Sequence, residues 1–130
     1  MDTFIKSPIK IHDENEWAFR WSCMNGNLKT AQWLYQLSVK INSPINIHAE
    51  FEDAFHWSCR RDFLETAQWL YQLSIEINSP INIHVTREVI FRSVCSNGYP
   101  EIAKWLHQVS TETNSLIDIH RSVILDVYPN

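Results

Sequence analysis

Glycine is almost absent from this chain, because only Gly26 and Gly98 occur among 130 residues. Left-handed turns favour glycine, so the sequence can supply few glycine-dependent hairpins. Long apolar runs are also absent, and none approaches the ~18 residues that a membrane span needs. Residues 1–15 lack the charged and apolar segments of a signal peptide. We therefore expect an intracellular protein without a membrane partner.

Basic charge and cysteine are scarce as well. Eleven Lys and Arg stand against 15 Asp and Glu, which gives a formal net charge of −4. Nucleic-acid binding needs concentrated positive charge, so no nucleic-acid partner is expected. The three cysteines, Cys23, Cys59 and Cys95, are odd in number and lie 36 residues apart. This pattern favours single buried thiols in a reducing compartment over a disulfide framework.

A 36-residue repeat organises the chain. FRWSCMNGNLKTAQWLYQLS at 19–38 recurs as FHWSCRRDFLETAQWLYQLS at 55–74 and as FRSVCSNGYPEIAKWLHQVS at 91–110. Such self-similarity is typical of stacked units that cannot bury their apolar faces alone. We predict one repeat domain over 1–130. It would contain partial repeats at 1–12 and 121–130 and full repeats at 13–48, 49–84 and 85–120.

Each repeat is predicted to form two helices. In the first helix, Phe19, Ser22 and Cys23 lie on one face of a 3.6-residue period. Gly26 follows as the left-handed residue that ends the helix, and Asp62 is expected to take the same conformation in the next repeat. The opening of this helix resembles a capping box, formed by Asp13 and Glu16, with Thr86 as a cap in the third copy.

The second helix carries an apolar stripe at helical spacing. The stripe consists of Thr30, Trp33, Leu34, Leu37 and Ile41. Trp69 and Trp105 repeat Trp33, so we predict that all three tryptophans are core anchors. The helices should end before the Asn-Ser-Pro segments at 42–44 and 78–80, because proline ends a helix and restricts the preceding residue. Short extended links at 45–48 and in its copies should follow.

These repeats resemble ankyrin repeats. FHWSCRRDFLETAQWLYQ is similar to the family pattern of a leucine and a histidine, a small-residue pair, a turn glycine and a leucine pair. The matching positions are Phe55, His56, Ser58, Cys59, Asp62, Trp69 and Leu70, with Ile117-Asp118-Ile119 similar to the segment that follows. The TAQWLYQL and INIH segments are similar to ankyrin-like repeats of giant amoeba-infecting DNA viruses. This resemblance implies a viral protein located in the host cytoplasm.

The chain departs from the ankyrin pattern in repeat length and in its turns. Ankyrin repeats have about 33 residues and a finger with a glycine and a Thr-Pro pair, whereas residues 49–54 contain neither. We therefore predict an all-α fold, an ankyrin-like helix-turn-helix solenoid with short or absent β-hairpin fingers. Partner contacts would shift from the fingers to the concave face formed by the first helices.

Periodic histidines and cysteines could indicate metal or nucleophilic chemistry, but their spacing argues against both. Packed helices lie about 8–10 Å apart, whereas zinc needs its ligand atoms ~2 Å from one ion. No metal or cofactor is therefore expected, and hydrogen bonds to turn backbone are the alternative role. A Cys59–His56 nucleophile is disfavoured because the equivalent positions of His56 carry arginine, so no catalytic residue is predicted. The histidines in question are His12, His48, His84 and His120.

The other side of the first helix is the candidate partner-binding surface. Trp17 and Trp21 lie about 160–200° from Phe19 on a helical wheel, and Trp57 repeats Trp21. Exposed aromatics flanked by arginine are typical of interface hot spots. Sideways packing between neighbouring helices is the alternative role for the position of Trp21 and Trp57. The predicted surface comprises Trp17, Arg20, Trp21, Met24, Asp53, His56, Trp57, Arg60 and Arg92.

Two functions are compatible with these features. The first is a non-catalytic protein–protein interaction scaffold whose partner is a protein, with a host protein as one candidate. The second is a structural array segment that self-associates through exposed terminal repeats or belongs to a larger viral assembly. The apolar segments Phe4-Ile5 and 123–127 favour the second function, because terminal repeats normally present polar outer faces.

Overall fold

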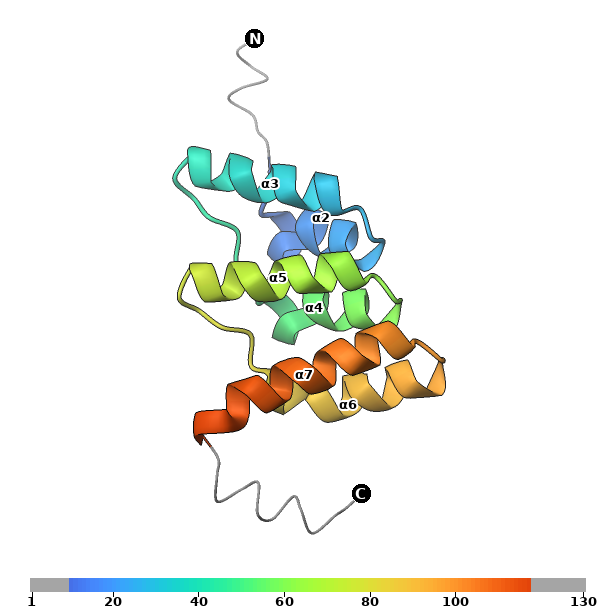
Figure 1. Cartoon of the computed structure of the whole chain (residues 1–130). Coiled ribbons are helices and arrows are strands. Elements are labelled where there is room, and N and C mark those ends of the chain that lie inside the picture. Colours follow the sequence, from blue (N-terminus) through green and yellow to red (C-terminus); the bar gives the residue numbers. More distant parts are fainter. Residues whose placement is uncertain (1–9, 118–130) are drawn as a thin grey trace. The chain divides into compact units, whose positions relative to one another are not determined.

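The computed structural model describes residues 10–117, including all their side chains except those of residues 84–88 and 113–117. Within this part of the chain six helices follow one another without a strand (Figure 1), which confirms the all-α prediction. The chain divides into two compact units, Met1–Asn82 and Ile83–Asn130. Several predicted features lie outside the described residues: Phe4-Ile5, the side chains of His84 and Thr86, His120, and the partial repeat at 121–130.

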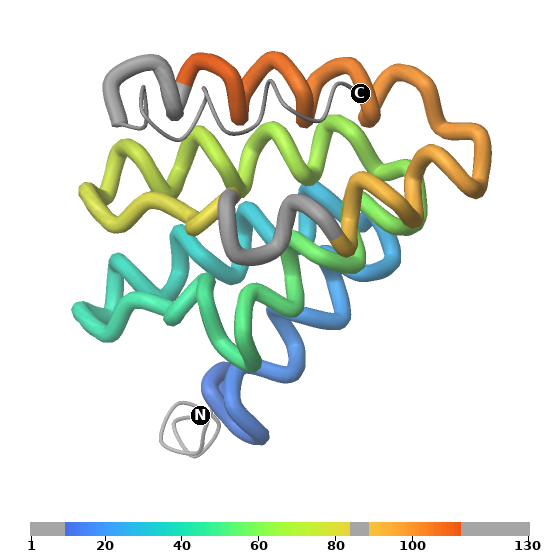
Figure 2. Tube along the Cα trace, turned by 90° about the horizontal axis from the view of Figure 1, so that it is seen from below, coloured from blue at the N-terminus to red at the C-terminus, as the bar shows by residue number. Residues whose placement is uncertain are grey.

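The first unit contains two helix pairs of matching length. α2 spans Asp13–Met24 and α3 spans Leu28–Lys40. α4 spans Ala49–Arg60 and α5 spans Leu64–Glu76, so every boundary of the second pair lies 36 residues after its counterpart. α2 and α4 contact each other in one layer, and α3 and α5 lie side by side in a second layer (Figures 1 and 2).

The core of the first unit forms where the first-helix layer meets the second-helix layer. Phe19 and Phe55 are fully buried, as are Cys23 and Cys59 one turn later. The predicted apolar face of the first helix is therefore confirmed. Complete burial of a phenylalanine side chain stabilises a fold by about 1.5–3 kcal/mol, so these two rings make large contributions.

The predicted stripe on the second helix is confirmed in α5, where Thr66, Leu70 and Leu73 are buried, and only in part in α3. In α3 the buried side chains are Ala31, Leu34 and Ser38, whereas Thr30 and Ile41 are exposed. Helix pairs that pack closely place small side chains at the contact, and a pattern of large apolar residues does not reveal those positions. In α3 the predicted stripe therefore includes exposed residues that lie beside the contact.

The prediction that the repeated tryptophans are core anchors is also wrong for Trp33, whose side chain is 59% exposed. Trp69 is part-buried, with its ring centroid 6.1 Å from that of Phe19 and 6.5 Å from that of Tyr35. This position therefore packs against the preceding helix pair and not inside its own pair. Trp105 is part-buried within the second unit's α7.

The helix ends confirm the predicted breakers and add two more. Gly26, Asp62 and Gly98 have φ of 71°, 65° and 73° and follow the first helices. Asn42 and Asn78, with φ of 63° and 62°, follow α3 and α5. At each of these ends the next amide donates to a carbonyl five residues earlier, as in a Schellman motif. Asparagine and aspartate tolerate this conformation better than other non-glycine residues.

α2 and α4 begin with a left-handed turn that the sequence did not suggest. Residues 14–16 have φ of 55°, 53° and 65°, and residues 50–52 have φ of 59°, 56° and 64°. His12 is the N-cap of α2 and no side chain caps the helix, so the predicted capping box is wrong. Left-handed backbone costs about 1–2 kcal/mol per non-glycine residue. Other contacts must therefore hold these turns in place.

The second unit is a single helix pair in its described part. α6 spans Ile83–Ser96 and α7 spans Pro100–Ile117, with the proline in the first turn as predicted. Within the described residues, no helix has both the length and the apolar character needed to cross a membrane. Buried side chains of this pair are Ile90, Val94, Ile102, Leu106 and Val109.

Candidate interaction surface

Trp17 and Trp21 form an exposed aromatic pair on α2. Their side chains are 43% and 46% exposed, and their rings meet edge to face with centroids 6.3 Å apart. The pair lies one helical turn apart, so the α2 backbone fixes both positions. Edge-to-face aromatic packing holds the rings without removing them from solvent. Of the two alternatives that the sequence left open, exposure therefore holds for both of these tryptophans.

Trp57, on α4, occupies a different environment from its counterpart Trp21. It is part-buried, and the guanidinium carbons of Arg60 and Arg61 lie 4.9 and 5.0 Å from its ring centroid. Arg61 also donates to the Met24 carbonyl oxygen at 3.3 Å, which joins α4 to the end of α2. Packing between neighbouring helices therefore buries part of the Trp57 ring. The sequence had not suggested Arg61.

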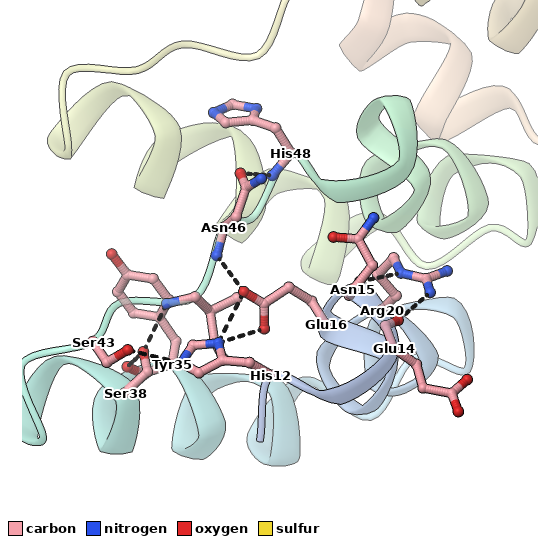
Figure 3. Close-up of polar contacts among 11 residues, drawn as sticks. His12, Glu14, Asn15, Glu16, Arg20, Tyr35, Ser38, Ser43, Asn46 and His48 are labelled. Carbon is pink, nitrogen blue, oxygen red and sulfur yellow. Dashed lines mark hydrogen bonds and ion pairs between the residues drawn. The ribbon is translucent and has the colours of Figure 1, made fainter. Parts of the chain in front are cut away.

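Arg20 makes several hydrogen bonds within the chain. Its Nη1 donates to Asp53 Oδ2 on α4 at 2.9 Å. Its Nε and Nη2 donate to the carbonyl oxygens of Asn15 and Glu14 at 2.9 and 3.1 Å (Figure 3). The guanidinium therefore holds the left-handed turn of α2 and links it to α4. Arg20 and Asp53, predicted as contact residues, are both engaged within the chain.

His56 and Arg92 occupy the position of Arg20 in the following repeats. His56 is half-buried, and its Nε2 has no hydrogen-bond partner among the described residues. Burial lowers the pKa of His56, the nearby Arg60 lowers it further, and Asp53 partly opposes both. Arg92 is exposed on α6 in the second unit.

A His–Glu–Ser network recurs in the two repeats of the first unit, and Figure 3 shows the first of the two. His12 Nδ1 lies 2.9 Å from Glu16 Oε1, and His12 Nε2 lies 3.0 Å from Ser43 Oγ. His48, Glu52 and Ser79 repeat both contacts at 2.7 and 2.9 Å. Because a carboxylate only accepts, Nδ1 donates to it, and Nε2 of a neutral ring then accepts from the serine hydroxyl.

This connectivity is that of a Ser–His–acid triad, but the surroundings of the serine are those of a structural clasp. A serine nucleophile needs amide donors for the oxyanion that develops during attack. The Ser43 amide donates to the Ser38 carbonyl oxygen, and the Ile45 amide donates to Ser38 Oγ. Asn46 donates its amide to Glu16 Oε2, and Pro44 has no amide hydrogen. The network therefore ties the loop after α3 to the left-handed turn of α2.

The predicted role of the described histidines is thus corrected, because His12 and His48 bond to side chains and not to turn backbone. The signal for this network was present in the sequence. Glutamate recurs at 16, 52 and 88, and serine recurs at 43, 79 and 115, with the same period as the histidines. Three kinds of polar residue that recur with the same period indicate a hydrogen-bonded contact among them in each repeat.

One exposed aromatic residue, Phe51, has no signal in the sequence. Phe51 is 92% exposed in the left-handed turn of α4. Its counterparts are Asn15 and Arg87, so no repeat pattern marked this position.

Metal ligands do not gather anywhere in the described part of the chain, since no three His, Cys, Asp or Glu side chains there could hold one ion. Comparison with protein-family models, with curated proteins and with solved structures found no match to this chain.

Proposed function

We propose that this protein is a non-catalytic interaction scaffold that binds a partner protein through the layer formed by α2 and α4. Its architecture would be an ankyrin-like helix-turn-helix solenoid with short or absent fingers. The equal helix lengths, the 36-residue offset and the α2–α4 contact support this architecture. The viral resemblance of the repeats makes a host protein the first partner class to test.

The exposed Trp17–Trp21 pair is the observation that carries the proposal. An indole presents a large apolar area at little conformational cost, and tryptophan is among the residues most enriched in binding hot spots. Arg20 lies over the Trp17 ring at 5.7 Å and is itself held by Asp53, so the arginine restrains the ring. A partner would therefore meet a surface that is already ordered, which lowers the entropic cost of binding.

The partner chemistry follows from this composition. Two exposed indoles suit an apolar or aromatic side chain of the partner, and each indole N–H can donate to a backbone carbonyl oxygen. Trp57, beside Arg60 and Arg61, extends the same composition onto α4. A protein segment that combines an apolar side chain with acidic neighbours would match both the exposed indoles and the adjacent arginines.

The proposal is tested with the double substitution Trp17→Ser and Trp21→Ser. Wild-type and variant chains are immobilised and exposed to an amoeba lysate, and each captured protein is purified and titrated against both chains. We expect at least one purified protein to bind the wild type and to lose 10-fold or more in affinity with the double variant, because each hot-spot truncation costs roughly 1–2 kcal/mol or more.

Ile75→Ser is the matched control, since Ile75 is an exposed apolar residue on α5 in the other layer. It should leave partner affinity unchanged. Far-UV circular dichroism must show that all chains keep wild-type helicity. Equal binding by the double variant would overturn the assignment of this surface.

A further inference from the structure

Ser43 and Ser79 are exposed serines that each precede an exposed proline. Both follow the left-handed asparagine after a second helix, and neither serine belongs to a helix. Proline disfavours the helical conformation for the residue before it, so it favours an extended backbone at each serine. Proline-directed protein kinases modify serines of this kind, which precede a proline at the surface of the substrate.

The hydroxyl of each serine contacts a histidine side chain. Ser43 Oγ lies 3.0 Å from His12 Nε2 (Figure 3), and Ser79 Oγ lies 2.9 Å from His48 Nε2. Because Nδ1 of each ring donates to a glutamate, Nε2 of the neutral ring accepts from the serine hydroxyl. The backbone amides of the two serines donate to carbonyl oxygens five residues earlier. Rotation of the hydroxyl away from the histidine therefore leaves the backbone of the loop anchored.

We propose that Ser43 and Ser79 are phosphorylation sites of a proline-directed protein kinase. In this reaction the serine Oγ forms a bond to the γ-phosphorus of ATP, and the bond between that phosphorus and the β–γ bridging oxygen breaks. ADP leaves with the electron pair, and the hydroxyl proton passes to the catalytic aspartate of the kinase. The co-reactant is therefore ATP, and the partner is a kinase that selects the following proline.

Phosphorylation removes the hydrogen that each serine donates to its histidine. In its place come phosphate oxygens with a charge of about −1.5 to −2 at pH 7. A neutral Nε2 presents only a lone pair to these oxygens, so the two groups repel each other. The Glu52 carboxylate, 2.7 Å from His48 Nδ1, adds like charge on the other side of the ring. A phosphate on Ser79 should therefore separate the loop after α5 from the start of α4.

The helix end next to Ser79 acts in the same direction. α5 ends at Glu76, and the C-terminal end of a helix carries partial negative charge. A phosphate at such an end, close to acidic side chains, is disfavoured. The corresponding last turn of α3 carries Lys40, which opposes this effect at Ser43. Ser79 is therefore the site at which release of the histidine contact is measured.

Phosphorylation is tested with the complete 130-residue chain, MgATP and a purified mitogen-activated protein kinase that is active on a standard substrate. Peptide mapping by mass spectrometry should find phosphate on both Ser43 and Ser79. Ser96 is the internal control, because it is exposed but ends α6 and precedes Asn97. It should stay unmodified. Absence of phosphate from Ser43 or Ser79, or phosphate on Ser96, would overturn the proposal.

Pro44→Ala and Pro80→Ala are the matched variants. Each keeps its serine and removes the proline that follows, so each should lose most of the phosphorylation at that serine and keep it at the other. Far-UV circular dichroism must show wild-type helicity for both variants. Equal rates in the variants and the wild type would show that proline does not direct the modification, which also contradicts the assignment.

Release of the His48 contact is measured in a chain that carries Ser7→Ala and Ser43→Ala, so that Ser79 is the one serine left before a proline. Measurement at pH 8 keeps an ordinary imidazole neutral. Phosphorylation should lower the melting temperature by about 2–8 °C, as loss of a hydrogen bond does in a chain of this size.

The same chain with Ser79→Ala added is the control, and kinase treatment should leave its melting temperature unchanged. An unchanged or raised melting temperature on phosphorylation of Ser79 would contradict release of the histidine contact. None of these substitutions alters Trp17 or Trp21. Failure here is therefore distinguishable from failure of the scaffold proposal.

Discussion

At the scale of single residues, equivalent positions of the repeats have different environments. Gly26 and Gly98 share a positive φ, but only Gly26 is covered by a ring of the next helix pair. Trp33 and Trp69 share a sequence context, yet one is exposed and the other is packed against Phe19. Position within the stack, and not residue type, decides these environments.

Gly26→Ala should destabilise the protein more than Gly98→Ala. Both substitutions place a Cβ in left-handed backbone, which costs about 1–2 kcal/mol. Only the first also drives that Cβ into the Phe63 ring. Urea unfolding should show an additional loss of about 1–3 kcal/mol for Gly26→Ala, as overpacking typically causes. Equal losses would show that Phe63 does not cover Gly26.

His56 should make stability fall as the pH drops below about 6.5. Burial and Arg60 lower the folded pKa of His56 below the ordinary histidine value of about 6.5, so the unfolded chain binds more protons in this range. The loss should begin near pH 6.5 and level off once the pH is below the folded pKa. His56→Gln removes the titrating group, so its urea midpoint between pH 7 and 5 should depend less on pH than that of the wild type. An unchanged dependence would contradict the assignment.

At the scale of elements, the left-handed turns of α2 and α4 are the costly feature of the fold. Arg20 and His12 engage carbonyl and carboxylate groups of the α2 turn, and His48 engages the Glu52 carboxylate of the α4 turn. Asn15 Nδ2 also donates to Glu50 Oε2 at 2.6 Å, which joins one turn to the next. These contacts offset the cost of the backbone conformation.

Phe51→Gly should stabilise the protein by about 0.5–1 kcal/mol. Glycine relieves a left-handed cost of about 1–2 kcal/mol and loses part of that gain through its greater freedom when unfolded. The 92% exposed ring gives up almost no burial. Phe51→Ala is the control that keeps the Cβ and should gain little. In a right-handed helix the glycine variant would instead lose about 1 kcal/mol, so the sign of the change in urea unfolding tests the turn.

Arg20→Ala should cost about 1–3 kcal/mol of stability, because it removes charge-assisted hydrogen bonds from a part-buried site. Arg92→Ala changes the equivalent residue of the third repeat, which is exposed. Its effect should remain within about 0.5 kcal/mol. Thermal unfolding of the two variants compares these costs directly. Similar losses would argue against the role of Arg20 in holding the α2 turn.

At the scale of the whole molecule, the three cysteines report where the repeats are covered. Cys23 and Cys59 are fully buried, and burial raises the pKa of both thiols. Cys95 is exposed, so the prediction of three buried thiols is wrong for this residue. The described structure therefore buries the cysteine position in the first two repeats and leaves it exposed in the third.

Maleimide labelling of dilute native protein should modify one thiol per chain quickly, and peptide mapping should identify it as Cys95. Cys23 and Cys59 should react only when the protein opens, because a buried thiol with a raised pKa offers little thiolate. Denaturant should bring all three thiols to similar rates. Fast labelling of Cys23 or Cys59 in native protein would contradict the burial of these residues.

The sequence by itself determined the local structure. Its period placed the helix pairs, the breakers at Gly26, Asp62 and Gly98 ended the first helices, and the wheel position of Trp17 and Trp21 placed them opposite Phe19. These features depend on backbone preferences and on spacing along one helix, which neighbouring residues are enough to set.

Only the tertiary structure decided which side chains meet across elements. The His12–Ser43 contact joins residues 31 positions apart, and the exposure of Trp33 depends on whether another helix pair lies against α3. The left-handed turn of α2 likewise relies on Arg20 and on Asp53 of the next repeat. A single repeat holds no information on its neighbour's position, because burial and hydrogen bonding between repeats arise only when the repeats stack.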